Sequence, residues 1–90
     1  MVTFNLPSQM RAMVEGRKTL AVPAATLGEA FERLDEVAPM LRSQIFTVAG
    51  DIRQFVGLFV DQRQVVALGD GSLPVREGSD IVIVMAVAGG

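Results

Sequence analysis

The residue types that most often perform chemistry in proteins are missing from this chain. It has 90 residues and contains neither cysteine nor histidine. Disulfides, thiolate metal ligands and cysteine nucleophiles are therefore excluded, and so are the commonest metal ligand and the commonest general base. An ordinary hydrolytic or metal-dependent enzyme is not expected, and we predict no catalytic residue and no metal site.

The C-terminal segment is the part of the sequence that could still take part in a reaction. Glycine lacks a Cβ, so two glycines in a row let the backbone approach another molecule closely. The small alanines keep the segment slim, and the apolar residues between them offer contacts on alternate sides of an extended chain. We expect this segment to enter a narrow channel of a partner; it comprises Ala86, Val87, Ala88, Gly89 and Gly90.

A glycine pair at the end of a chain can also be a chance occurrence, frayed chain or a cloning scar. At an average glycine usage of about 7%, an arbitrary pair of positions is Gly-Gly roughly 0.5% of the time. The functional interpretation of the pair is therefore favoured.

The overall composition indicates one compact domain. Half of the residues are hydrophobic and 20% are charged, which supplies enough apolar surface for one core. The net charge is −2 and the basic residues are scattered, so nucleic acid is not expected as a partner. No run reaches the roughly 20 apolar residues of a membrane span, and the N-terminus lacks the pattern of a secretion signal. We expect a cytoplasmic protein with no membrane partner.

Strand and helix patterns alternate along the chain. Apolar alternation or short apolar runs predict strands at residues 2–6, 19–22, 54–61, 65–68 and 81–85. Between the second and third of these, Thr26-Leu27-Gly28-Glu29 has the form of a capping box, and apolar residues then recur at helical spacing. Pro39 ends this helix near Val37, and we expect a looser turn from there to Phe46. Residues 7–18 are expected to form a loop, and its Met10 and Met13, with Met40, are interpreted as core filler.

The predicted fold class is α+β. A helix with one apolar stripe can cover only one face of a sheet, so we expect a mixed sheet of four to five strands with one main helix packed on one face. Residues 1–85 would form this domain, and residues 86–90 would form the extended C-terminal tail.

The last eleven residues, Asp80 to Gly90, closely resemble the C-terminus of MoaD/ThiS-family sulfur carriers, which end in Gly-Gly after a strand that follows a Gly-Asp turn. The resemblance covers most of the chain, including residues 26–28, 55–61 and 74–78. The ending looks most like the small subunits of molybdopterin synthase and the carriers for cysteine biosynthesis. Two positions differ: many relatives have proline where this chain has Met85, and they often have Asp-Gly-Asp where it has Glu77-Gly78-Ser79-Asp80.

This resemblance implies a ubiquitin-like β-grasp fold and a carrier that is not itself an enzyme. In such carriers an adenylyltransferase related to ubiquitin-activating enzymes uses ATP and magnesium to adenylylate the terminal carboxylate, here that of Gly90. Sulfur then displaces AMP to give a thiocarboxylate. A sulfur-accepting synthase uses that sulfur to make molybdopterin, thiamine, cysteine or another thio-metabolite. The chain itself would bind no cofactor.

The resemblance also implies a partner-binding surface. Strand alternation turns Phe59, Val82 and Val84 away from the helix, and exposed apolar clusters often mark partner surfaces. We predict a partner-binding patch of these three residues with Met85, on the face that meets activating enzymes in ubiquitin-like proteins. A loop or a second copy covering the patch is the alternative. Two other functions remain open: a protein modifier that joins Gly90 to a lysine, and a non-catalytic β-grasp adaptor.

Overall fold

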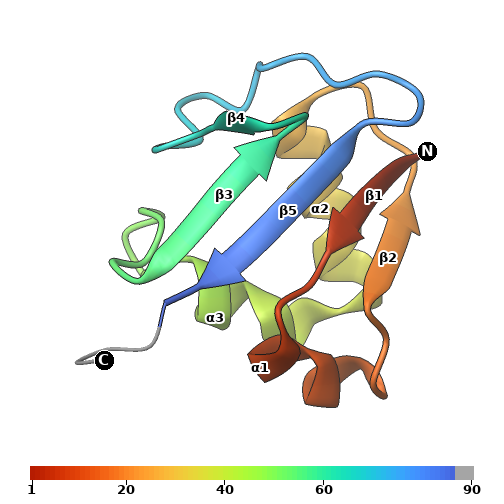
Figure 1. Ribbon diagram of the computed structural model, residues 1–90. Helices are drawn as coiled ribbons and strands as arrows, with labels where there is room; N and C mark the ends of the chain where they lie inside the picture. Colours follow the sequence, from red (N-terminus) through yellow and green to blue (C-terminus); the bar gives the residue numbers. More distant parts are fainter. Residues whose placement is uncertain (87–90) are drawn as a thin grey trace.

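A computed structural model describes residues 1–86 as one mixed sheet with helices packed against one of its faces (Figure 1). The strand order is β2-β1-β5-β3-β4. This architecture confirms the predicted α+β class and the single main helix. The strands are β1 (Val2–Asn5), β2 (Thr19–Val22), β3 (Val56–Val60), β4 (Arg63–Gln64) and β5 (Asp80–Met85). The helices are α1 (Ser8–Arg11), α2 (Leu27–Val37) and α3 (Arg42–Ile45), with 3-10 turns at Ala12–Val14 and Pro39–Leu41.

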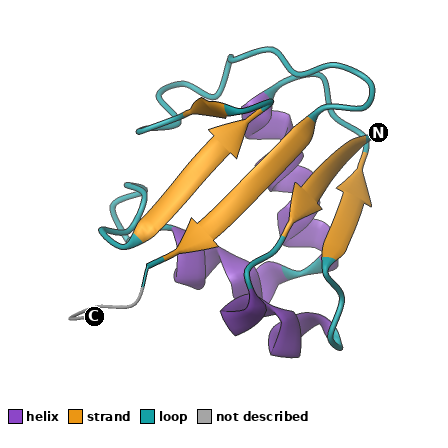
Figure 2. Ribbon diagram, viewed as in Figure 1, coloured by secondary structure: helices purple, strands orange, loops and turns teal. Residues whose placement is uncertain are grey.

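The fifth strand lies in the middle of the sheet. It pairs in parallel with β1, where Phe4 is opposite Ile81, and antiparallel with β3, where Leu58 is opposite Ile83. The strands β1 and β2 pair antiparallel, with Phe4 opposite Leu20. Figure 2 shows α2 behind the sheet and leaves the other face, here called the open face, uncovered by helix.

The start of α2 follows from its capping residues. The Glu29 amide donates to the Thr26 hydroxyl at 3.1 Å, while the Glu29 carboxylate accepts from the Ala25 amide at 2.7 Å. These bonds satisfy amides that a helix start leaves without partners. The helix ends at Val37, as predicted, and it is too short to cross a bilayer, as are the other helices of residues 1–86.

The core lies between α2 and the sheet. The Phe31 ring from α2 packs edge-on against Phe4 of β1, with centroids 5.2 Å apart, and against Phe46 at 5.0 Å. Edge-to-face pairs add stabilisation beyond simple burial. The inward residues of β3 and β5 complete the core: Leu58, Val60, Ile81 and Ile83.

The loop between β4 and β5 is fastened to the start of α2. The Leu27 amide donates to the Leu73 carbonyl at 2.8 Å, and the Gly28 amide donates to the Gly71 carbonyl at 2.9 Å. The two glycine backbones touch, because a Cβ built on Gly28 would lie 3.0 Å from both the Cα and the carbonyl oxygen of Gly71. This contact requires glycine on both sides.

Three sequence predictions about local structure were wrong. The short strand predicted at residues 65–68 is absent; β4 is instead Arg63–Gln64, because a two-residue turn at Asp61 and Gln62 reverses the chain immediately after β3. Both turn residues have positive φ, 47° and 73°, as this tight hairpin geometry requires. Residues 8–14, predicted as loop, form α1 and a 3-10 turn. Met10 is buried as expected, but Met13 and Met40 are exposed.

Candidate functional site

The predicted tail begins where the central strand ends. Met85 is the last residue of β5 and pairs with Val56 of β3, and the following Ala86 amide donates to the Phe55 carbonyl at 2.8 Å. The chain is thus held to β3 as far as the exposed Ala86. The other predicted tail residues lie outside the described residues, so their proposed role and the division at residue 86 stay predictions: Val87, Ala88, Gly89 and Gly90.

Three of the four predicted patch residues come together on the open face. Phe59 of β3 is directly opposite Val82 of β5, and Val84 is opposite Gly57. Phe59 and Val82 are half-buried, and Val84 is 42% exposed. The side chains therefore form a continuous apolar surface across two neighbouring strands, here called the open-face patch.

Gly57 makes room for this patch, a role that the sequence analysis missed. A Cβ at Gly57 would lie 2.7 Å from a methyl carbon of Val84 and 3.4 Å from the Phe59 ring. Both side chains therefore lean over the glycine from either side. An isolated glycine within an apolar strand is the sequence signal for such a close approach.

Met85 does not join the other three. It packs against the edge of the core, on the side of the sheet that α2 covers. There it lines a shallow hollow at the base of the tail together with Arg53, Phe55 and Ala86. Phe55 is 47% exposed and lies in the turn before β3.

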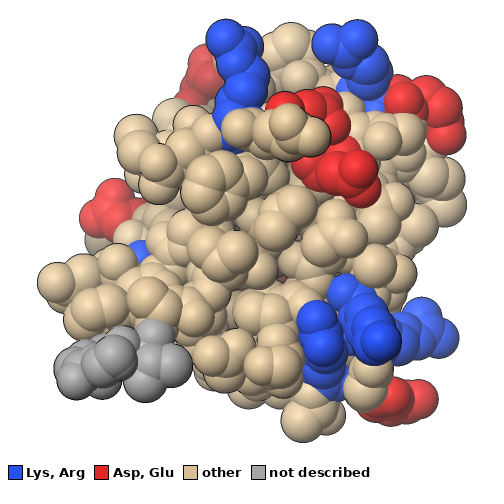
Figure 3. Space-filling view, viewed as in Figure 1, with Lys and Arg blue, Asp and Glu red and all other residues tan. Residues whose placement is uncertain are grey.

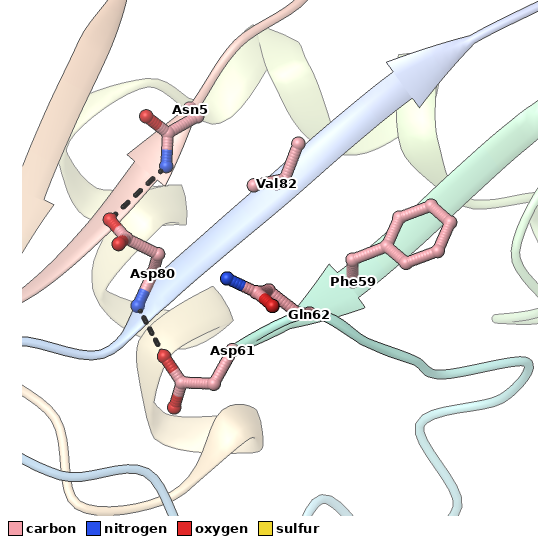
Figure 4. A pocket seen from close by; sticks show the side chains of 6 residues that line it. All are labelled: Asn5, Phe59, Asp61, Gln62, Asp80 and Val82. Carbon is pink, nitrogen blue, oxygen red and sulfur yellow. Dashed lines mark hydrogen bonds between the residues drawn. The ribbon is translucent and has the colours of Figure 1, made fainter.

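One end of the open-face patch is polar. Figure 4 shows a hollow in which Phe59 and Val82 form one wall, and Asn5, Asp61, Gln62 and Asp80 form the other. The Asp61 carboxylate accepts bonds from the Asp80 amide at 2.9 Å and from the Ser79 hydroxyl at 2.8 Å. The hydrogen bond from the Asp80 amide has the larger effect on the pKa of Asp61, and the bond from Ser79 has the next largest. Both hold this pKa below its usual value, so the carboxylate is charged at neutral pH.

Charged side chains surround the open face, and its centre carries none in this view. In Figure 3 the centre of the sheet shows no charged side chain, while acidic and basic groups both lie toward the top and further basic groups gather at the lower right. Within residues 1–86, no three acidic side chains lie close enough to hold a metal ion. The described part of the site is thus an apolar surface near the end of β5, with no evident acid–base pair.

Comparison with known proteins shows similarity along the whole chain. No protein-family model matches. The curated sulfur carrier protein CysO of Mycobacterium tuberculosis is 25% identical over 91 residues, which cover 99% of this chain and 98% of the relative. That relative is named a carrier and not an enzyme. The predicted resemblance to sulfur carriers is confirmed by this relative.

Solved structures share the fold. The crystal structure of M. tuberculosis CysO matches with a TM-score of 0.83 and 22% identity over 97% of this chain and 100% of that one. A chain of the Amycolatopsis orientalis BexX/CysO complex matches with a TM-score of 0.81 and 20% identity over 100% of both chains. SAMP1 of Haloferax volcanii matches with a TM-score of 0.79 and 20% identity over 99% of this chain and 98% of its own. The ubiquitin-like β-grasp fold is thereby confirmed.

Proposed function

We propose that this protein is a sulfur carrier whose terminal carboxylate, on Gly90, is adenylylated by a partner enzyme and then converted to a thiocarboxylate. The observation that carries the proposal is the place where β5 ends. This central strand leads directly to Ala86, where the predicted tail begins, and it carries two of the three open-face patch residues, Val82 and Val84. Similarity to CysO along the whole chain supports the same function.

The chemistry belongs to the partner, and the carrier contributes the group that changes. A carboxylate oxygen of Gly90 attacks the α-phosphorus of ATP, and pyrophosphate leaves. A sulfur nucleophile then attacks the acyl carbon, and AMP leaves with the oxygen that it captured. ATP and magnesium are bound by the adenylyltransferase, so the carrier is proposed to work in the cytoplasm, where ATP is available.

The open-face patch is proposed to bind this adenylyltransferase. An uncharged apolar centre with a charged rim is the usual anatomy of a protein interface. The two-sided pairing of β5 fixes Val82 and Val84 relative to Ala86, so docking at the patch would aim the tail in one direction. Residues 86–89 would then pass into the channel of the enzyme.

The direct test is a sulfur-transfer assay on the intact chain. The protein is incubated with an adenylyltransferase encoded beside it, ATP, magnesium and sulfide, and its intact mass is measured. We expect a gain equal to the exchange of one oxygen for sulfur, abolished when Gly90 is deleted. An unchanged mass in the presence of an enzyme that accepts another carrier would count against the proposal.

A patch variant separates docking from tail chemistry. Phe59→Ala should raise the KM of adenylylation about tenfold, because centrally buried aromatic residues often contribute 1–2 kcal/mol or more to an interface. Val66→Ala is the matched control, since Val66 is 82% exposed and lies outside the patch. Equal KM values for the two variants would remove the patch from the docking surface.

A protein-modifier function is the second candidate, favoured by the likeness to SAMP1, a small archaeal modifier protein. In that case Gly90 would form an isopeptide bond with a lysine of a target. Higher-mass conjugates that disappear on deletion of Gly90 would support it. If deletion of Gly89 and Gly90 leaves partner binding and activity intact, the chain is instead a non-catalytic adaptor.

The receiving enzyme is proposed to be a sulfur-accepting synthase. The purified thiocarboxylate form can be offered to candidate synthases for molybdopterin, thiamine and cysteine. Loss of sulfur from the carrier, with formation of one of these products, would assign the pathway.

A further inference from the structure

Exposed apolar side chains also gather away from the open face, at the C-terminal end of α2. Met13, Val37 and Met40 are 37%, 61% and 47% exposed, and they come from three separate segments of the chain. They surround a hollow that is also lined by Val14 and Leu20. Large apolar side chains that converge around one hollow are more informative than the same side chains scattered singly.

A basic segment adjoins this hollow. Arg17 lines the hollow together with Glu15, and Arg11 and Lys18 lie in the same short segment. None of the three basic residues forms an ion pair within residues 1–86. Glu15 is the one acidic residue between them, so residues 11–18 carry a net charge of +2 in a protein whose net charge is −2. In Figure 3 blue side chains gather at the lower right, over α1 and the segment that leads to β2.

The backbone holds these basic residues in place. The Arg11 Nε donates to the Leu6 carbonyl at 3.1 Å, and the Arg17 amide donates to the Val14 carbonyl at 3.2 Å. Glu15 and Gly16 have positive φ values of 59° and 79°, which turn the chain sharply between Val14 and Arg17. The charges are therefore presented by a defined turn next to the hollow.

The topology places this surface at the same end of the sheet as the tail. Because β1 and β5 run in parallel, β1 delivers the chain to α1 at the edge where β5 delivers it to Ala86 (Figure 1). A partner that holds the tail can therefore reach the hollow as well.

We propose that this surface, defined by Met13, Val37, Met40, Arg11, Arg17 and Lys18 and called the basic methionine surface, docks an acidic amphipathic segment of a protein partner. Apolar side chains of that segment occupy the hollow, where flexible methionines adapt to them. Its carboxylates pair with Arg17 at the hollow and with Arg11 and Lys18 in the adjoining segment, which favours the encounter and sets its register. The inference does not require sulfur transfer, because no tail residue takes part.

A protein segment fits better than a phosphate-bearing partner. Phosphate backbones are bound by many lysine and arginine contacts, whereas this hollow is apolar and its charged lining residues are Arg17 and the acidic Glu15. Anionic lipid is bound through clusters of four or more cations. The described surface offers three.

The test is a titration of the full-length, isotope-labelled protein followed by NMR. The probe is a synthetic helical peptide of about 14 residues, roughly four turns, with leucine on one face and glutamate on the other. A second peptide carries lysine in place of glutamate, and anionic phospholipid vesicles form a third arm. We expect saturable shifts at residues 11–20 and 37–41 with the acidic peptide alone, weakened by added salt.

Variants locate the site within the same experiment. The pair Arg17→Glu and Lys18→Glu should weaken binding about tenfold or more, and Met13→Ser with Met40→Ser should weaken it similarly. Arg63→Glu, on the exposed β4, is the charge-matched control for Arg17→Glu alone. Deleting Gly89 and Gly90 should leave binding of the acidic peptide unchanged, which separates this inference from the sulfur-carrier proposal.

Three results would each overturn the inference. The first is the absence of saturable shifts with the acidic peptide. The second is shifts confined to β3 and β5. The third is binding to the lysine peptide or to the vesicles that equals or exceeds binding to the acidic peptide.

Discussion

Replacing Gly28 by alanine should destabilise the protein, although the same change within a helix normally stabilises it. Alanine is favoured over glycine in a helix by about 0.5–1 kcal/mol. Here, however, the new Cβ would lie 3.0 Å from the Cα and the carbonyl oxygen of Gly71, which are backbone atoms that cannot rotate away. Overpacking of this kind costs about 1–3 kcal/mol. A shift of the loop would also lengthen the hydrogen bonds that the Leu27 and Gly28 amides donate to it. Each of these bonds contributes about 1 kcal/mol to stability.

The net expectation for Gly28→Ala is a loss of about 1–3 kcal/mol in the free energy of unfolding. For a chain of this size that loss lowers Tm by roughly 5–20 °C. Urea unfolding followed by circular dichroism measures the first quantity, and a thermal scan measures the second. The control compares Glu32→Ala with Glu32→Gly, on the exposed side of α2. The difference in their free energies of unfolding measures the preference of a helix for alanine over glycine where no clash occurs.

The facing glycine gives an independent check. Gly71 has a φ of +78° and Gly78 a φ of +83°, but only a Cβ on Gly71 would approach other backbone, at 3.0 Å from Gly28. Gly71→Ala should therefore cost more than Gly78→Ala, which suffers the backbone strain alone. If Gly28→Ala is as stable as the natural chain, or if the two turn variants lose equal stability, the close contact of loop and helix is refuted.

Three further predictions concern the open face and the turn beside it. Gly57→Ala should slow adenylylation while changing the free energy of unfolding by less than about 1 kcal/mol, because the obstructing Val84 methyl is exposed and can rotate; parallel kinetics and urea unfolding would test this. Ser79→Ala should lower the free energy of unfolding by about 1–3 kcal/mol in urea, because Ser79 is 2% exposed and its hydroxyl is hydrogen-bonded. The lowered pKa of Asp61 contributes stability that is present above the unfolded-state pKa, near 4, and is lost as pH falls through the folded value. Asp61→Asn should remove that part of the acid dependence, and an unchanged pH profile of unfolding would contradict the assignment.

Local sequence signals predicted the elements that local interactions determine. The capping box at Thr26 and Glu29 fixed the start of α2, and the alternation of β3 and β5 predicted which side chains face the core. The open-face patch followed from the same alternation for Phe59 and Val82. The prediction that Met85 belongs to this patch was wrong, because the alternation of β5 places Met85 on the side of the sheet that α2 covers.

The remaining features depend on how distant segments meet. The turn at Asp61 and Gln62 uses positive φ at two residues that are not glycine, so no turn signal marked the position of β4. Burial of the methionines could not be predicted from composition, because Met13 and Met40 become neighbours only when the end of α2 meets the chain after α1.

The pairing of β5 on both sides also determines how the protein responds to force. A partner that draws the tail into a channel pulls β5 along its own axis. The ladder to β3 joins five residue pairs, from Val56 and Met85 to Val60 and Ile81, and the ladder to β1 joins three more. Such a load shears both ladders at once, so their hydrogen bonds must break together and not one after another. The protein can therefore bear a load at the end of β5 without unfolding one residue pair at a time.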